Sequence, residues 1–315
     1  MNFLITGGAG FIGSNVAKRL LEKGHRVIVY DNLSRPNVFK NVMWLITRHK
    51  GVKFLQYSTR NFERVRQVVH DYNIEFIFHF AGQVGVQASI NDPWGDFQDN
   101  AIGTFNVLEA ARSSEKLPHV VFASTNKVYG DFETDKPTSE SQPLSFCTPY
   151  GCSKGAGEQY VLDYNRVYKL PTTVLRMSCI YGSRQWGQEE QGWLCHFMFS
   201  KERNESITIY GDGNQVRDTL YIDDYVDLCM ALVENKTKVA GQVFNIGGGP
   251  DNQISVIDAV KRIGNEYKFA DWRPSDQKYY VSDISKIKET LGWEPKVGVE
   301  EGLERLKKWV ESQSR

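Results

Sequence analysis

Tyr150 and Lys154 are the two residues whose types and spacing best suit proton transfer. They stand four positions apart in the segment YGCSK, and residues four apart share one face of a helix. A lysine charge favours the phenolate of a nearby tyrosine and lowers the pKa of its phenol. With Thr125 upstream, these residues form a proton-handling set, and a phenolate beside a nicotinamide ring suits reversible alcohol–ketone chemistry. Alone, this spacing is common on exposed helix faces, so the interpretation depends on the segments that precede it.

A dinucleotide-binding fingerprint lies at the start of the chain. A short apolar run, residues 2–5, leads into the segment TGGAGFIG, and an amphipathic helix is expected directly after it. Gly7, Gly10 and Gly13 lack side chains, so the backbone can approach a pyrophosphate that rests on the helix N-terminus. The alternative is a tight turn that needs glycines only for its own geometry. Because a strand and a helix flank the turn, we favour the cofactor site.

Asp31 ends a second predicted strand, residues 26–30, and follows Gly13 by eighteen positions. A carboxylate there can accept hydrogen bonds from a ribose 2′-hydroxyl and repels a 2′-phosphate, which favours NAD over NADP. Arg35 lies close by and can in principle accept that phosphate. The alternative for Asp31 is a simple turn residue at the end of its strand.

Composition indicates a soluble enzyme rather than a nucleic-acid or membrane protein. The 315 residues carry a formal net charge of zero, without a basic stripe or an apolar run long enough to cross a bilayer. The chain opens directly in a strand, so we expect no signal peptide. Five scattered cysteines and six histidines show no metal-binding spacing, so we expect a reduced, cytoplasmic setting and no metal site.

Strand and helix patterns alternate through the first half of the chain. The remaining predicted strands cover residues 52–55, 76–80, 120–123 and 174–176, and the predicted helices cover 38–49, 62–72, 100–111 and 150–164. Six such units predict an α/β fold with a doubly wound parallel Rossmann sheet. We expect residues 1–180 to bind NAD, with later segments returning to that domain. Residues 181–315 are expected to form mainly a smaller, interleaved α/β lobe that binds substrate.

Four motifs together resemble those of the extended short-chain dehydrogenase/reductase family, in particular its nucleotide-sugar epimerases and dehydratases. They are residues 6–13, the AGQ of 81–83, the STNKVYG of 124–130 and the YGCSK of 150–154. With Gln191-Gly192-Trp193 and the QVRD of 215–218, they are similar to enzymes that act at C2 of a CDP-3,6-dideoxyhexose. The resemblance implies NAD as cofactor, a nucleotide-diphosphate sugar as substrate, and inversion of a stereocentre through a transient ketone. It also implies a homodimer that pairs through the helices near residues 100–111 and 150–164.

The resemblance assigns roles residue by residue. The catalytic residues are Thr125, Tyr150 and Lys154. The residues expected to bind NAD are Gly7, Gly10, Phe11, Ile12, Gly13, Asp31, Asn32, Ser34, Arg35, Ala81, Gln83, Asn100, Tyr150 and Lys154. The residues expected to bind substrate are Gln83, Thr125, Asn126, Gln191, Trp193, Arg217 and Arg273.

Three positions depart from common family patterns. Tyr57-Ser58 stands where many members carry Gly-Asp, so adenine binding must rest on other contacts. Cys179 stands where UDP-hexose 4-epimerases usually carry a substrate-binding asparagine, although we favour plain packing as the explanation of this cysteine. Asn126-Lys127 stands where 4,6-dehydratases carry an Asp-Glu acid pair, which argues against dehydration.

Each substrate residue also has a simpler explanation. Arg217 can form an ion pair with Asp218 or Asp223, Trp193 can pack in the core, and Gln83 can cap its strand. Lys127 can be a solvated loop charge, and His79 reads as a buried strand residue. Two further functions stay open: epimerisation at C4 of a UDP-hexose, and a non-catalytic nucleotide-binding or redox-sensing protein on the same fold.

Overall fold

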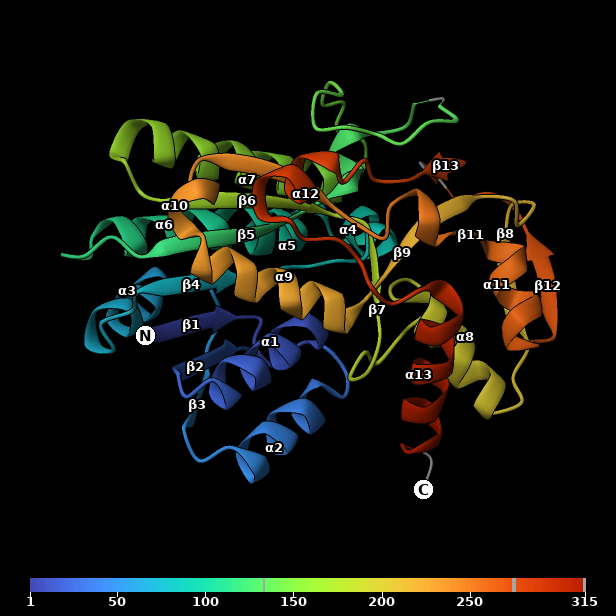
Figure 1. The fold of residues 1–315 in the computed structure, drawn as a ribbon, viewed down its shortest axis with the longest axis horizontal. Coiled ribbons are helices and arrows are strands. Elements are labelled where there is room, and N and C mark those ends of the chain that lie inside the picture. The colour runs from blue at the N-terminus through green and yellow to red at the C-terminus, as the bar shows by residue number, and fades with distance from the viewer. Residues whose placement is uncertain (133, 274–275, 314–315) are drawn as a thin grey trace.

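A parallel sheet of seven strands forms the centre of the molecule (Figure 1). The structure is a computed structural model that describes residues 1–132, 134–273 and 276–313. The strand order is β10-β6-β5-β4-β1-β2-β3. The strands are β1 (Asn2–Thr6), β2 (Arg26–Asp31), β3 (Val52–Gln56), β4 (Phe76–His79), β5 (His119–Thr125), β6 (Thr172–Met177) and β10 (Gln242–Ile246). The predicted doubly wound fold is confirmed, and β10 adds an edge strand that the strand predictions did not include.

Helices cover both faces of this sheet, so its middle strands are buried almost throughout. On one face lie α3 (Phe62–Asp71), α6 (Gly103–Arg112) and α7 (Thr148–Tyr168). On the other lie α1 (Phe11–Glu22), α2 (Val38–Arg48) and α9 (Ile222–Glu234). The predicted helix at 100–111 starts earlier, because a π-helical turn (Gln98–Ile102) leads into α6. The short helices α4 (Val86–Asn91), α5 (Pro93–Phe97) and α10 (Lys236–Val239) complete this part.

Smaller sheets and helices flank the end of the central sheet toward which β1 points (Figure 1). Strand β9 (Val216–Tyr221) pairs with β7 (Cys179–Tyr181), β11 (Gln253–Ser255) and β13 (Tyr279–Tyr280). Strands β8 (Ile207–Tyr210) and β12 (Tyr267–Ala270) form a separate pair. The helices here are α8 (Trp193–Glu202), α11 (Val256–Ile263) and α13 (Val299–Glu311), whereas α12 (Ser285–Leu291) packs on β10 of the central sheet. This arrangement agrees with the predicted smaller, interleaved lobe.

The strand order reverses between β1 and β4, and this reversal opens a crevice at their carboxyl ends. From β1 the chain proceeds outward through β2 and β3, whereas β4 starts the opposite series through β5 and β6. In open α/β sheets, ligands bind at such a switch point. The predicted glycine turn and the end of β5 both lie at this edge.

The glycine turn after β1 is packed too tightly for side chains. Gly7 has a φ of +68°, and a Cβ on it would lie 2.6 Å from the backbone nitrogen of Ala81. A Cβ on Gly13 would lie 2.3 Å from the carbonyl oxygen of Gly7. The first turn of α1 therefore packs directly on the backbone of the glycine turn.

His79 connects β4 to the elements on either side. Its Nδ1 lies 2.6 Å from the hydroxyl of Thr6 and its Nε2 lies 3.0 Å from the hydroxyl of Thr104. Burial, with a smaller effect from the charge of Lys154, lowers the pKa of His79 to about 3. His79 is therefore a buried, neutral strand residue, as the sequence indicated.

Replacing Gly13 with alanine should destabilise the protein by about 1–3 kcal/mol, because the added methyl group forces α1 away from the glycine turn. Denaturant unfolding measures this change. The matched control is Gly298→Ala, where an added Cβ meets nothing within 4 Å. Equal stabilities of the two variants would contradict the close packing described for Gly13.

Replacing His79 with glutamine should give a stability loss that depends on pH. The folded pKa of His79 lies below its ordinary value of 6.5, so its stabilising contribution is present above pH 6.5 and is lost as pH falls toward 3. The difference in free energy of unfolding between wild type and His79→Gln should therefore shrink by up to about 1.4 kcal/mol per pH unit below 6.5. A difference that stays constant from pH 7 to 5 would contradict this account.

Candidate active site

Two adjoining cavities lie at the carboxyl edge of the sheet, and Gln191 lines both of them. The first extends from the glycine turn to α7. The predicted cofactor residues that line it are Gly7, Gly10, Phe11, Ile12, Gly13, Asp31, Asn32, Ser34, Arg35, Ala81, Tyr150 and Lys154. The second cavity lies between the turn after β5 and the smaller sheets. The structure thus brings most of the predicted cofactor residues together around one space.

The glycine turn and α1 have the features of a pyrophosphate cradle. Gly10 caps α1 without a side-chain hydrogen bond, so the first N–H groups of the helix are left for a ligand. The space that side chains would fill at Gly7 and Gly13 is taken by backbone. A dinucleotide therefore fits this turn, as judged by its backbone geometry.

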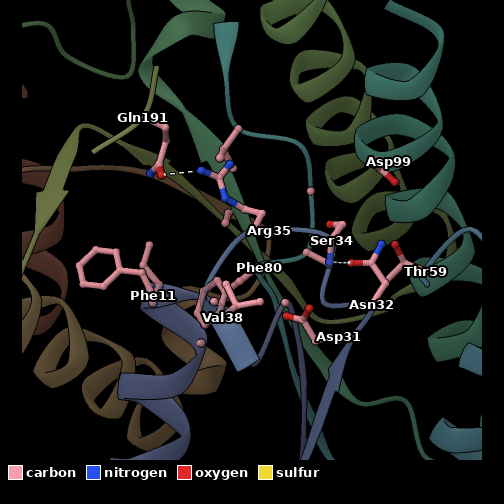
Figure 2. Close-up of a pocket in the computed structure, with 18 of the residues that line it drawn as sticks. Phe11, Asp31, Asn32, Ser34, Arg35, Val38, Thr59, Phe80, Asp99 and Gln191 are labelled. Atoms are coloured by element: carbon pink, nitrogen blue, oxygen red, sulfur yellow. Dashed lines mark hydrogen bonds between the residues drawn. The ribbon is translucent and has the colours of Figure 1, made fainter. Parts of the chain in front are cut away.

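Asp31 holds the glycine turn as well as facing the first cavity (Figure 2). Its carboxylate accepts hydrogen bonds from the backbone N–H groups of Ala9 (3.0 Å) and Leu33 (2.8 Å). Burial raises the pKa of Asp31, and these backbone bonds oppose the rise. Asp31 is thus more than the simple turn residue of the alternative interpretation, because it ties the end of β2 to the cradle.

Arg35 crosses the first cavity toward the second. Figure 2 shows its side chain directed at Gln191, to which its Nη2 donates a hydrogen bond of 3.1 Å. Burial lowers the pKa of Arg35. Nearby, the backbone N–H of Ser34 donates to the side-chain oxygen of Asn32 at 3.1 Å, which shapes the turn after Asp31. Arg35 therefore joins the two cavities at the residue that they share.

Gln83 and Asn100 occupy structural positions and line neither cavity. The side chain of Gln83 closes its own turn, donating to the carbonyl oxygen of Gly85 at 2.7 Å and accepting from its N–H at 2.5 Å. Asn100 is buried and donates to the carbonyl oxygen of Gln83 (3.0 Å), the carboxylate of Asp96 (3.0 Å) and the hydroxyl of Ser153 (3.2 Å). In this structure the side chain of Gln83 caps the end of its strand, as in the simpler explanation, because its amide nitrogen and its amide oxygen both bond to the backbone of Gly85.

Thr125, Tyr150 and Lys154 meet on one wall of the crevice. Thr125 ends β5, while Tyr150 and Lys154 share a face of α7. A hydrogen bond joins the Thr125 and Tyr150 side chains, and the Nζ of Lys154 lies 4.4 Å from the centre of the Phe122 ring. The exposed fractions of the three residues are only 6%, 8% and 4%. The arrangement can hold a sugar hydroxyl between a threonine and a proton-accepting tyrosine.

Burial controls the proton affinities of this set. It raises the pKa of Tyr150 to about 12, although the Thr125 hydrogen bond and the charge of Arg35 lower it. Burial also lowers the pKa of Lys154 to about 8, opposed by the charges of Asp96 and Glu158. In the protein alone, desolvation of the phenolate thus outweighs the groups that lower the tyrosine pKa, and the effect of Lys154 on Tyr150 stays a prediction.

Asp96 is a buried carboxylate beside this set that the sequence analysis missed. It accepts hydrogen bonds from the Ser153 hydroxyl (2.5 Å) and from Asn100, and its exposed fraction is 1%. Burial raises the pKa of Asp96, while Ser153 and the charge of Lys154 lower it. The available signal was spacing, because Asp96 precedes Asn100 by four residues on the same helical stretch.

Arg217, Arg273, Gln191 and Trp193 line the second cavity together. Arg217 donates to the carboxylate of Asp276 at 2.8 Å and to the carbonyl oxygen of Gln277 at 2.5 Å. The alternative prediction, an ion pair of Arg217 with Asp218 or Asp223, is therefore wrong, because its carboxylate partner is Asp276. Arg273 lies 3.7 Å from the centre of the Tyr210 ring and contacts Glu189 at 3.3 Å. Two guanidinium groups in one cavity suit the oxygen atoms of a diphosphate.

The remaining predicted substrate residues lie behind or beside the second cavity. Asn126 is buried and donates to the side-chain oxygen of Gln277 at 3.2 Å, and it does not line the cavity. Thr125 lines neither cavity, although its partner Tyr150 lines the first. Lys127 and Cys179 do line the second cavity, so Lys127 is not the solvated loop charge of the alternative interpretation.

Within the described residues, no group of three or more His, Cys, Asp and Glu side chains is placed to hold a metal ion. None of the helices in this part of the chain is both long enough and apolar enough to cross a membrane.

Comparison with known proteins gives a family and several similar enzymes. Residues 4–306 match the model of the GDP-mannose 4,6 dehydratase family. The chain is 39% identical to a CDP-paratose 2-epimerase of Salmonella typhi, over 99% of this chain and 100% of that protein.

Two solved structures have the same fold over the whole chain. A UDP-glucose 4-epimerase of Thermotoga maritima, solved with UDP-glucose, has a TM-score of 0.88 and 34% identity and covers 100% of both chains. A UDP-glucose 4-epimerase of Thermus thermophilus, solved with NAD, has a TM-score of 0.88 and 31% identity and covers 99% of both chains.

The cradle, the buried Thr125–Tyr150–Lys154 set and these full-length similarities agree with one another. They show that NAD is the cofactor and that the protein is an enzyme rather than a non-catalytic binding protein. The chain belongs to the GDP-mannose 4,6 dehydratase family of extended short-chain dehydrogenases/reductases, whose members include NAD-dependent nucleotide-sugar epimerases and dehydratases.

Proposed function

We propose that this enzyme epimerises a nucleotide-diphosphate sugar through a transient ketone, and that its substrate pair is CDP-paratose and CDP-tyvelose, inverted at C2. The observation that carries the proposal is the burial of Thr125, Tyr150 and Lys154 together on one wall of the crevice, with Tyr150 and Lys154 lining the cavity that contains the glycine cradle. A proton acceptor thus lines the same cavity as the cofactor cradle, and two arginines line the adjoining cavity. The 39% identity to the Salmonella 2-epimerase supports the choice of sugar and carbon.

Each residue of the set has a defined task in this reaction. The Thr125 hydroxyl holds the oxygen of the reacting sugar carbon, and Tyr150 takes the hydroxyl proton during oxidation and gives it back during reduction. Lys154 keeps a positive charge beside the tyrosine and binds the nicotinamide ribose. NAD, when bound, would supply the acceptor and donor of the hydride at the sugar carbon, and the positive charge of its nicotinamide would favour the phenolate of Tyr150.

Epimerisation is favoured over dehydration by the residues after Thr125. In 4,6-dehydratases, an Asp-Glu pair directly after the catalytic threonine or serine supplies the acid and the base for dehydration of the keto sugar. Asn126 and Lys127 stand at these positions here, and neither has a carboxyl group. The proposed next step is therefore reduction of the ketone, after the sugar has rotated so that the opposite face of the carbonyl points toward the cofactor. Because hydride returns to the substrate from which it came, no external reductant is consumed.

Epimerisation at C4 of a UDP-hexose is the second candidate. It is favoured by the fold likeness to the Thermotoga maritima 4-epimerase at 34% identity. Against it stands Cys179, which lines the second cavity where such enzymes usually carry an asparagine.

Arg217 and Arg273 bind the diphosphate in this proposal, and Trp193 packs beside the nucleotide sugar. Asp31 binds the adenosine ribose and gives the preference for NAD. Residues 1–180, with later segments such as β10, form the cofactor domain, and residues 181–315 form mainly the substrate lobe.

We also propose a homodimer that forms through α6 and α7. Four aromatic or aliphatic side chains are exposed on these helices: Phe105, Tyr160, Val167 and Tyr168. Phe105 and Tyr160 contact each other edge to face at 5.4 Å between ring centres, so they form one apolar surface. A cytoplasmic location agrees with the absence of disulfides among the five cysteines, all of which lie in the described residues.

Replacing Tyr150 with phenylalanine should reduce turnover by about 10²–10⁴-fold, because the ring stays and the proton carrier is lost. Bound NAD, measured after denaturing the purified protein, should be unchanged. Tyr160→Phe is the matched control, since it removes the same hydroxyl from an exposed position of the same helix. Near-native turnover of Tyr150→Phe would remove the phenolate from the mechanism.

Incubation with a panel of CDP-, UDP- and GDP-sugars should show conversion of CDP-paratose to CDP-tyvelose. The inverted carbon is identified from proton coupling constants in the NMR spectrum of the product. Interconversion of UDP-glucose and UDP-galactose alone would exclude the 2-epimerase and leave the second candidate.

A further inference from the structure

Asp96 joins α5 to the turn of α7 that carries the catalytic residues. Its carboxylate accepts hydrogen bonds from the Ser153 hydroxyl at 2.5 Å and from Nδ2 of Asn100 at 3.0 Å, and these two side chains also bond to each other at 3.2 Å. Ser153 directly precedes Lys154 and follows Tyr150 by three residues. Asp96 is therefore bonded to the same helical turn that positions Tyr150 and Lys154.

A second side chain from the preceding segment holds the same turn without a charge. The backbone N–H of Tyr150 belongs to the first turn of α7, where such groups have no partner within the helix. It donates to the hydroxyl oxygen of Ser89 on α4 at 3.1 Å, and Ser89 is fully buried. The catalytic turn is thus held by one neutral contact from α4 and one carboxylate from α5.

The hydrogen bonds of Asp96 suit a carboxylate rather than a carboxylic acid. Ser153 and Asn100 both donate to it, and donated hydrogen bonds favour the ionised form of a carboxyl group. Burial raises the pKa of Asp96, and the Ser153 bond and then the charge of Lys154 oppose the rise. The negative charge is therefore supported by neutral donors and by a nearby lysine.

The other carboxylate that favours the charge of Lys154 is already paired. Glu158 stands one helical turn after Lys154 on α7 and forms an ion pair of 2.5 Å with Arg176 of β6. It also accepts a hydrogen bond of 2.7 Å from the hydroxyl of Ser124. By contrast, none of the ion pairs within the described part of the chain includes Asp96. Asp96 therefore keeps a negative charge that no arginine offsets in this way.

The further titratable groups around this cluster do not replace Asp96. His79 of β4 is buried and neutral. Asp99 of the π-helical turn pairs with Arg60 at 2.6 Å. Tyr150 on α7 is a phenol whose pKa is raised by burial.

Asp96 also fixes the orientation of Asn100. Because Nδ2 of Asn100 donates to Asp96, its Oδ1 points to the other side of the amide. A Cβ on Gly82 would lie 2.5 Å from this oxygen and 3.7 Å from Nζ of Lys154, so both atoms lie beside the same backbone position. The negative end of the amide dipole is thus on the side of the lysine, where it favours a positive charge.

We propose that Asp96 is a positioning residue of this enzyme. It holds Ser153 and Asn100 against the catalytic turn of α7, and its negative charge keeps the side chain of Lys154 in the ammonium form. The inference rests on the proposed function for the task of Lys154 in the reaction.

The pH dependence follows from the sign of this interaction. Burial lowers the pKa of Lys154 to about 8, and the charge of Asp96 is the largest influence that opposes the change. Removal of the Asp96 charge lowers the pKa of Lys154 further, so the ammonium is lost at a lower pH. Turnover that needs the ammonium then declines at a lower pH on the alkaline side.

The test compares the protonation of Lys154 in the wild type and in Asp96→Asn, both loaded with NAD. Lysine labelled with ¹³C at Cε reports protonation by NMR, and Lys154→Met identifies the signal. In Asp96→Asn the titration of Lys154 should move by about one unit toward lower pH, because a nearby opposite charge favours the ionised form. The alkaline limb of the turnover profile should move in the same direction.

Control variants separate the charge from the hydrogen bonds. Asp163→Asn removes an exposed carboxylate from α7 and should leave the lysine titration unchanged. Ser153→Ala removes a hydrogen bond but keeps the Asp96 charge, so its titration should move much less than that of Asp96→Asn. Asp96→Ser replaces Asp96→Asn if the latter does not fold, because Asn100 and Ser153 can stay bonded to each other.

An unchanged titration of Lys154 in the Asp96 variants would overturn the proposal. An equal shift in Ser153→Ala would do so as well, since hydrogen bonding rather than charge would then be responsible. Failure of the proposed function gives a different result, namely no turnover of any nucleotide sugar by the wild type. The titration of Lys154 needs no sugar, so it tests Asp96 in that case too.

Discussion

Burial of two ionisable side chains in one wall of the crevice is the constraint on which the rest of the site depends. Tyr150 and Lys154 are almost fully enclosed, and enclosure disfavours the charged form of each. The surrounding polar groups limit this cost: Asp96 and Glu158 favour the charge of Lys154, while Thr125 hydrogen-bonds Tyr150. Asn100 and Ser153 hold Asp96 in place. Burial therefore raises the pKa of the Tyr150 phenol in the protein alone, and further positive charge beside it would favour the phenolate.

The same constraint explains how the two cavities work together. Under the proposed function, the glycine cradle would orient a dinucleotide toward the buried tyrosine, and the cations of the second cavity would hold the diphosphate of the substrate. Arg35 and Gln191 connect the cavities, and Arg35 also contributes a positive charge that lowers the pKa of Tyr150.

Sequence patterns predicted the parts of this molecule that depend on local rules. The six strands, the glycine turn and the helix that carries Tyr150 follow from hydrophobic runs, glycine spacing and helical periodicity. Strand β10 was missed because it joins the sheet edge beside β6 after a long excursion through the smaller sheets, and no local signal encodes that pairing. Asp96 and the raised pKa of Tyr150 were missed for a related reason, since both depend on burial that several distant segments create together. Gln83 was assigned to the site from its position at a strand end, whereas its side chain closes the turn itself.

Direct hydride transfer is the central claim of this account, and an isotope measurement tests it most directly. A CDP-paratose that carries deuterium at C2 is converted in ordinary water, and the product is analysed by NMR and mass spectrometry. The account predicts that the deuterium stays on the inverted carbon, because the hydrogen that leaves C2 returns to it without contact with solvent. Replacement of the deuterium at C2 by solvent hydrogen would contradict it, since the carbon would then have exchanged a proton rather than a hydride.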